Sequence, residues 1–264
     1  MSDCRRSHRG ALLITIIGNT VSPYVRKALV ILILKGVEFE IDPIVPFFGN
    51  DDFSKLSPLR RIPVLVDGDA VINDSSVIAQ YIEERWPQPS ILPLTANARA
   101  KARWFEEFAD TRIGDVFIWK AFGKMVIAPA LFGAERDLNA HQMLLETEVA
   151  EIMDYLESVT AAEGFLCETF GLADISVAVM FRNMAYARWM PDAVRWPKVS
   201  AWLDRTESEL AMKEAIEWSN ALARTPPPEH GAKLASIGLK VTEKSYFASS
   251  PRRGPMTAIQ GNFP

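Results

Sequence analysis

The sequence has few cysteines and few histidines, and this scarcity limits the chemistry that it can support. Of its 264 residues, two are cysteine (Cys4 and Cys167) and three are histidine. Two cysteines cannot build a disulfide framework. They form no Cys-x-x-Cys pair and have no histidine at ligand spacing. We therefore expect no structural zinc site and no other metal, and the low cysteine count fits a reducing compartment.

The chain also lacks a basic excess and a long hydrophobic run. Its net charge is −4, whereas binding to nucleic-acid phosphates needs a basic field. The longest purely apolar stretch, residues 28–34, is far too short to span a bilayer. Arginines precede the apolar run at 11–17, but that run is short and no small-residue cleavage site follows. We expect a cytoplasmic protein that binds neither nucleic acid nor membrane.

The first part of the chain alternates between strand and helix patterns. Pro23 suits the first position of a helix, Gly36 suits its exit, and Asp-Gly-Asp at 67–69 predicts a hairpin turn. The predicted elements are strands at 11–17, 37–41, 62–66 and 70–72, and helices at 23–35 and 75–85. This order predicts an α/β domain over residues 11–86, with helices on the faces of a small mixed sheet.

The composition then changes twice. A proline-rich linker at 87–94 leads into residues 95–223, where a helical period dominates and an all-α domain is predicted. Helices are expected near 95–124, 138–162, 172–188, 196–208 and 211–223. The last part, 224–264, is rich in proline and net basic, and it cannot build a core. It is predicted to be an extended C-terminal tail, either docked along the acidic body or disordered.

Residues 22–25 read Ser-Pro-Tyr-Val and open the first predicted helix. In glutaredoxins and their relatives, this turn carries Cys-Pro-Tyr-Cys, whose two thiols exchange disulfides. Here Ser22 and Val25 occupy the thiol positions. The turn therefore cannot exchange disulfides through its own side chains, and Ser22 must have a different role from the cysteine that it replaces.

Three stretches, taken in order, resemble the cytosolic glutathione S-transferases. They are SPYVRKAL at 22–29, LSPLRRIPVLVDG at 56–68, which resembles the family's loop into a cis-proline, and VINDSSVIAQYI at 71–82. A fourth, GLADISVAVMF at 171–181, resembles the family's buried N-capping motif, although Gly171 stands where Ser or Thr is usual. The resemblance covers roughly residues 11–223. It implies a thioredoxin-like βαβ-ββα domain, a helical-bundle domain and a homodimer.

The resemblance is to the serine-type members of the family, and it implies that Ser22 is the catalytic residue. Glutathione must lose its thiol proton to react, and a thiol pKa is about 8.5 to 9 in water. A helix N-terminus favours the thiolate, and a hydroxyl there can donate a hydrogen bond to the sulfur. Ser22 would then hold a thiol that arrives with the ligand. The alternative is that Ser22 is simply the helix N-cap.

The two ends of glutathione need opposite partners. Its cysteinyl backbone could pair with the main chain of Ile62, just before Pro63, as an added strand. The γ-glutamyl carboxylate suits Ser75 at a helix N-terminus, and the amino group suits the Asp74 carboxylate. As an alternative, Asp74 and Ser75 form a plain helix cap.

The glycyl carboxylate of glutathione needs a cation. Arg61, Arg60 and Lys55 are candidates, and Arg61 is preferred among them. The resemblance thus assigns glutathione binding to Tyr24, Arg61, Ile62, Pro63, Asp74 and Ser75.

The electrophile is expected between the domains, in a pocket of apolar and aromatic residues. The candidates are Trp104, Phe108, Arg112 and Trp119, with Tyr24 and Trp218 as further possibilities. For most of the tryptophans, a role in the core is the alternative, because aromatics at helical spacing usually pack there.

Three functions follow from the resemblance. The first is a glutathione transferase that conjugates hydrophobic electrophiles in detoxification, with glutathione as cosubstrate and no other cofactor. The second is a glutathione-dependent disulfide reductase or ether-cleaving lyase. The third is a non-catalytic binding protein on the same fold. The lack of cysteine at position 22 disfavours thiol exchange through a mixed disulfide.

Overall fold

The computed structural model describes residues 13–255 and residue 257, and its N-terminal half is built on a four-stranded sheet. The strands are β1 (Ile14–Ile17), β2 (Phe39–Asp42), β3 (Val64–Asp67) and β4 (Ala70–Asn73). They lie in the order β2-β1-β3-β4, with β1 parallel to β2 and antiparallel to β3. Ile16, in β1, pairs with Ile41 on one side and Leu65 on the other, and all three are buried. The predicted mixed sheet is confirmed.

Helix α1 (Pro23–Leu34) lies at the centre of the molecule. It begins at Pro23, whose fixed φ suits a first helical turn, and it ends before Gly36, which has a φ of +63°. The helix packs against α3 (Ser75–Arg85) and against α8 and α10 of the helical half. Helix α1 is therefore hydrophobic almost all round, as expected of a helix with neighbours on every side. Two shorter elements, η1 (Pro46–Phe48) and α2 (Asp51–Leu56), follow β2.

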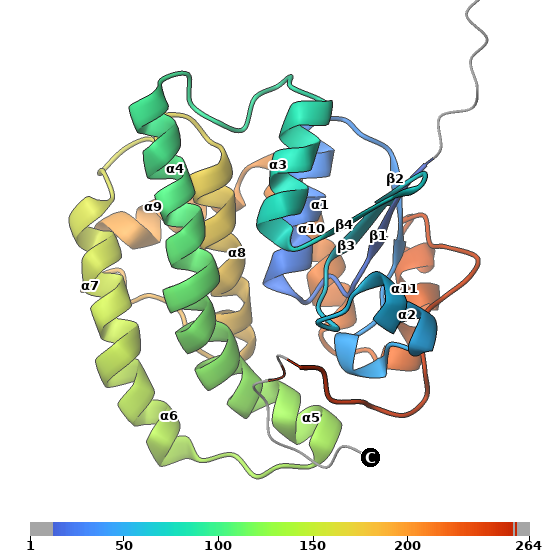
Figure 1. The fold of residues 1–264 in the computed structure, drawn as a ribbon. Helices are drawn as coiled ribbons and strands as arrows, with labels where there is room; N and C mark the ends of the chain where they lie inside the picture. Colours follow the sequence, from blue (N-terminus) through green and yellow to red (C-terminus); the bar gives the residue numbers. More distant parts are fainter. Residues whose placement is uncertain (1–12, 256, 258–264) are drawn as a thin grey trace, which may run out of the picture.

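The second half is all helical, as predicted. Its elements are α4 (Ala96–Phe108), η2 (Ala109–Ile127), α5 (Ala128–Phe132), α6 (Leu138–Leu144), η3 (Leu145–Val149), α7 (Ala150–Val159), α8 (Leu172–Tyr186), α9 (Pro197–Glu207) and α10 (Leu210–Leu222). Helix α4 continues through the wide turns of η2 into α5, and we call the first two the α4–η2 helix. Figure 1 shows α4 and α8 standing between α1 and α3 on one side and α6 and α7 on the other.

The start of α8 explains the unusual glycine. A Cβ on Gly171 would lie 2.5 Å from the carbonyl oxygen of Ile91, so no side chain fits there. The buried carboxylate of Asp174 instead accepts bonds from Gly171 N (3.3 Å), Leu166 N (2.9 Å) and Trp202 Nε1 (2.8 Å). The N-terminus of α8 is thus capped by the side chain of Asp174, within the helix, rather than by a side chain at position 171.

The C-terminal segment differs from the predicted extended tail. It contains η4 (Pro227–Glu229) and helix α11 (His230–Ser236), which packs on α10 and buries Leu234. Only beyond α11 does the chain run extended. There Val241 bridges to Ile41, and Phe247 bridges to Gly49. Figure 1 shows this last stretch passing α2 towards α5.

The boundaries of several elements shift by a few residues. The third strand begins at Val64 rather than 62, because Pro63 has no N–H for a sheet ladder. Residues 11 and 12 of the predicted first strand lie outside the described residues, as does Cys4. No helix in the described part of the chain is long and apolar enough to cross a membrane.

Candidate functional site

Ser22 is the N-cap of α1, at the end of a short loop that leaves β1. Its backbone is extended, and its N–H donates to the carbonyl oxygen of Asn19 at 3.0 Å. Its Oγ accepts from Val25 N at a long 3.5 Å. Within the described residues, the half-buried hydroxyl donates no hydrogen bond, so its proton is available to a ligand at the positive end of the helix dipole.

The loop before Ser22 is fixed to the helical half by Arg26. This buried guanidinium donates to the carbonyl oxygens of Thr20 and Val21, both at 3.1 Å. It also donates to Val179 O in α8 at 2.6 Å and to the side chain of Asn183. Burial lowers the pKa of Arg26 to about 10, so it stays cationic at neutral pH. Ser22 is therefore presented by a clamped loop.

Tyr24 lies beside Ser22 and reaches the helical half. Its hydroxyl sits over Gly114 in η2, where a Cβ would come within 2.5 Å of Tyr24 Oη. Burial, then the negative charge of Asp110, raise the pKa of Tyr24 well above its ordinary value, while Arg61 lowers it and Asp74 raises it. The phenol thus stays protonated at neutral pH. These influences also gather Tyr24, Arg61, Asp74 and Asp110 into one electrostatic neighbourhood.

Helix α3 supplies a second N-terminus to this neighbourhood. Asp74 is its N-cap, and the carboxylate accepts from Ser76 N at 2.9 Å. Asp74 is exposed and has a φ of +75°, an unfavourable backbone conformation for a residue with a side chain, of the kind that often marks functional sites. Ser75 is buried directly behind it. Asp74 is therefore a helix cap, as the alternative interpretation expected, and contact of Asp74 and Ser75 with a ligand stays a prediction.

The three candidate cations for the glycyl carboxylate lie in α2 and in the loop before β3, and they have different surroundings. Arg60 is engaged inside the domain, because it donates to Ser54 Oγ (2.5 Å) and Gly49 O (2.8 Å). Lys55 pairs with Asp52 on the surface at 2.8 Å.

Arg61 remains exposed, and its main chain exchanges hydrogen bonds with the Ser57 hydroxyl at 2.8 and 2.9 Å. The next peptide bond, Ile62–Pro63, is cis, as the family resemblance implies.

Sequence reasoning missed an ionic cluster beneath the two helix N-termini. Lys27, fully buried in α1, lies 2.8 Å from Glu106 Oε1 and 2.8 Å from Asp110 Oδ2. Ser76 Oγ donates to the same Asp110 oxygen at 2.8 Å, so the cluster joins α1, α3 and the α4–η2 helix. The available signals were a lysine, next to Arg26, inside a mostly apolar helix and two acids four residues apart. No group of His, Cys, Asp and Glu suited to a metal occurs among the described residues.

The proposed electrophile residues are placed differently. Trp104 is 52% exposed, stacks on Phe108 and donates to the hydroxyl of Tyr155 in α7 at 2.9 Å. Arg112 pairs with Glu148 and Glu151 at 2.7 and 2.8 Å. The structure does not bring Trp104, Phe108 and Arg112 together with Ser22, because the helix turns them towards η3 and α7 while Glu106 and Asp110 face α1.

The two remaining tryptophans also have defined places. Trp119 packs in a cluster with Phe47, Phe48 and Ala128, where η1 meets the end of η2. Trp218 is buried in α10 and meets Phe39 edge-on, with ring centroids 6.0 Å apart. Trp218 is therefore a core residue, which was the alternative to a place in the electrophile pocket.

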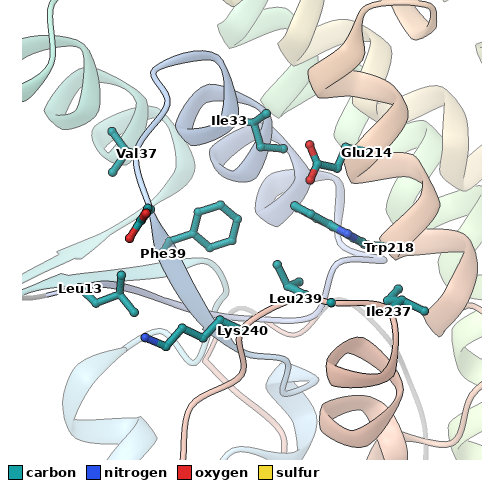
Figure 2. Close-up of a pocket in the computed structure, with 11 residues that line it drawn as sticks. Leu13, Ile33, Val37, Phe39, Glu214, Trp218, Ile237, Leu239 and Lys240 are labelled. Atoms are coloured by element: carbon teal, nitrogen blue, oxygen red, sulfur yellow. The ribbon is translucent and has the colours of Figure 1, made fainter.

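Trp218 and Phe39 line a cavity of about 360 Å³ at the edge of β2. Figure 2 shows Ile33, Glu214 and Leu239 around the same space. Its walls include none of the residues gathered around Ser22, so the cavity is separate from the candidate site.

Two family models match the chain. One describes the N-terminal domain of glutathione S-transferases and matches residues 21–85; the other describes their C-terminal domain and matches residues 134–205. Together they cover just over half of the sequence, and they share one family.

Individual relatives agree with these matches. The chain is 29% identical over 226 residues to glutathione S-transferase 3 of Zea mays, covering 81% of this chain and 97% of the relative. It is 27% identical over 173 residues to a stringent starvation protein A homolog of Pasteurella multocida (strain Pm70), covering 65% and 75%. A solved glutathione S-transferase from Rhodospirillum rubrum F11 superposes with a TM-score of 0.73 at 22% identity, covering 83% and 97%, and shows the same fold.

Proposed function

Because the chain belongs to the glutathione S-transferase family, we propose that it binds glutathione and activates the thiol for attack on a hydrophobic electrophile. Ser22 is the catalytic residue in this proposal. The supporting observation is its position: an N-cap serine whose hydroxyl proton has no acceptor within the described residues, on a loop clamped by Arg26. A donor fixed in advance stabilises developing negative charge without reorganisation.

The thiolate is stabilised by two features acting together. The N-terminus of α1 offers its dipole, and the Ser22 hydroxyl donates a hydrogen bond to the sulfur. Burial keeps the Tyr24 phenol protonated at neutral pH, because its pKa is raised, so Tyr24 does not act as a base that removes the thiol proton. Ser22 needs no ionisation of its own for its task.

The rest of glutathione is bound by the loop before β3 and by the N-terminus of α3. The exposed Arg61 faces the glycyl carboxylate, and the main chain of Ile62 before Pro63 pairs with the cysteinyl unit. Ser75 at the N-terminus of α3 takes the γ-glutamyl carboxylate, and Asp74 takes the amino group. The electrostatic neighbourhood of Tyr24, which includes both Arg61 and Asp74, supports one continuous site.

The protein also acts, in this proposal, as a cytoplasmic homodimer with a role in detoxification. Support for the dimer comes from large apolar side chains exposed on α4 and α6, namely Trp104, Leu138 and Met143. Such residues are natural candidates for burial across a two-fold axis. Light scattering at micromolar concentration tests this, and particles of 29.5 kDa alone, the mass of one chain, would contradict it.

Replacing Ser22 by alanine tests the catalytic assignment. We expect turnover of glutathione with an activated aryl halide to fall on the order of 10²-fold, the usual cost of one preorganised donor. The affinity for glutathione should change far less, because the bond is strongest to the thiolate. Ser22→Ala turning over at the wild-type rate would refute the role of Ser22.

A second variant tests where the thiol sits. Ser22→Cys places a protein thiol at the same point, so a mixed disulfide with glutathione should form under oxidising conditions and be visible by mass spectrometry. Retention of the wild type on immobilised glutathione without turnover of any electrophile would favour the non-catalytic binding protein instead.

A further inference from the structure

The C-terminal segment reaches the loop that presents Ser22. Helix α11 begins with His230, which is buried although it follows a proline-rich stretch. Its Nδ1 lies 2.7 Å from Nδ2 of Asn19, a residue 211 positions earlier in the chain. Both residues lie outside the ranges 21–85 and 134–205 that the family models match.

The hydrogen bonds fix the tautomer of His230. Nε2 is 2.9 Å from the carbonyl oxygen of Thr225, which can only accept, so Nε2 carries the hydrogen. In the neutral ring Nδ1 is then an acceptor. It takes a bond from the Asn19 amide nitrogen at 2.7 Å, which can only donate, although the carbonyl oxygen of Pro43 also lies 3.3 Å from Nδ1. Burial lowers the pKa of His230 below its ordinary value, which keeps the ring neutral at neutral pH.

The orientation of the Asn19 amide is fixed from its other end. Asn19 Oδ1 accepts from Val21 N at 2.7 Å, so the amide nitrogen must face His230. The carbonyl oxygen of Asn19 accepts from Ser22 N at 3.0 Å. A short chain of bonds therefore runs from the α11 histidine through Asn19 to the backbone of Ser22.

The supports of this loop act on different groups. Arg26, Ser219 and Asn183 donate to the carbonyl oxygens of Thr20 and Val21. The side chain of Asn19 bonds, within the described residues, only to Val21 and His230. If His230 lost its acceptor, the Asn19 amide nitrogen would be buried without a partner. The amide could then rotate and release Val21 N.

We propose that His230 is a positioning residue for Ser22, which it holds at the N-terminus of α1 through Asn19. The proposal rests on the catalytic role of Ser22 proposed above. It makes the C-terminal segment part of the support of the active site, since α11 delivers the one side chain that orients Asn19 among the described residues.

Two substitutions separate this role from general stability. In His230→Asn, Oδ1 takes the place of Nδ1 and can still accept from Asn19, but the bond to Thr225 is lost. In His230→Gln, the amide nitrogen takes the place of Nε2 and keeps the Thr225 bond, but the acceptor for Asn19 is lost. Each variant loses one buried hydrogen bond, so their melting temperatures should fall by similar amounts.

Kinetics should distinguish the pair. We expect His230→Gln to lower kcat with glutathione and an aryl halide roughly 10-fold, since small misplacements of a catalytic group can cost up to about 10². The KM for glutathione should change little. His230→Asn should keep kcat within about threefold of the wild type. Equal kcat in the two variants would overturn the proposal.

Hydrogen exchange of the Val21 and Ser22 amides, followed by NMR, gives a second readout that needs no turnover. Exchange should quicken in His230→Gln and stay near the wild-type rate in His230→Asn. A wild type without activity would defeat the proposed function, and the exchange data would still decide whether His230 orders the loop. Unchanged exchange in both variants would overturn the positioning role.

Discussion

The two faces of the α4–η2 helix each carry residues that depart from the usual distribution. The inner face places the acids Glu106 and Asp110 against α1, where they meet the buried Lys27. The outer face exposes an aromatic side chain, Trp104, and half-exposes Arg112 beside Glu148. Charges are usually outside and large apolar groups inside. Here the charges define where the two halves dock, and the aromatic group is left for the solvent or a partner.

The environments of the two sets of ion pairs explain why they should differ in energy. A buried charge whose partner is removed keeps its desolvation cost and loses its compensation. An exposed pair is replaced by water and is screened by salt. The inner face should therefore be sensitive to single substitutions, and the outer face should be tolerant.

The largest effect is expected from Lys27→Met. It leaves Glu106 and Asp110 beneath α3 without their shared cation, which should lower the free energy of unfolding by about 3–5 kcal/mol. Denaturant unfolding measures it.

Lys120→Met is the matched control on the more exposed side, where Lys120 pairs with Asp115 and Glu148 at 2.9 Å. It should cost no more than about 1 kcal/mol. Similar losses in the two variants would remove the distinction between the faces.

A smaller effect should appear where Tyr24 meets Gly114. Alanine gains about 1 kcal/mol over glycine within a helix. In Gly114→Ala, however, the new Cβ would lie 2.5 Å from Tyr24 Oη, so the ring has to move. We expect Gly114→Ala to lower the free energy of unfolding. Tyr24→Phe removes that oxygen and should recover the loss, with a coupling of roughly 0.5–3 kcal/mol in a double-mutant cycle. Strictly additive effects would show that the hydroxyl does not press on this glycine.

The parts of the fold that the sequence predicted well have strong local signals. The start of α1 follows from Pro23, and α3 has its predicted bounds because Asp74 caps it and its last turn ends at Arg85. The succession of strands and helices along the chain and the helical second half follow from periodicity together with the proline, glycine and turn residues.

The site was harder to predict, because its partners are far apart in the chain. Periodicity identifies a face of a helix but not the neighbour that the face meets, so Trp104, Phe108 and Arg112 were expected in the pocket. The contact of His230 with Asn19 has no local signal at all. Nor does the fit of Gly171 against Ile91, since only the assembled structure brings the carbonyl there.

The smallest effect is expected from Arg112→Gln on the outer face. Arg112 is about one-third exposed and pairs with Glu148 and Glu151, so its loss should cost up to about 1 kcal/mol of unfolding free energy. The cost should shrink in 1 M salt, where the Debye length is about 3 Å. Turnover should stay within about twofold of the wild type, because the guanidinium faces η3 and α7 rather than Ser22. A large loss of turnover, with a raised KM for the electrophile and unchanged stability, would return Arg112 to the pocket and erase the difference between the two faces.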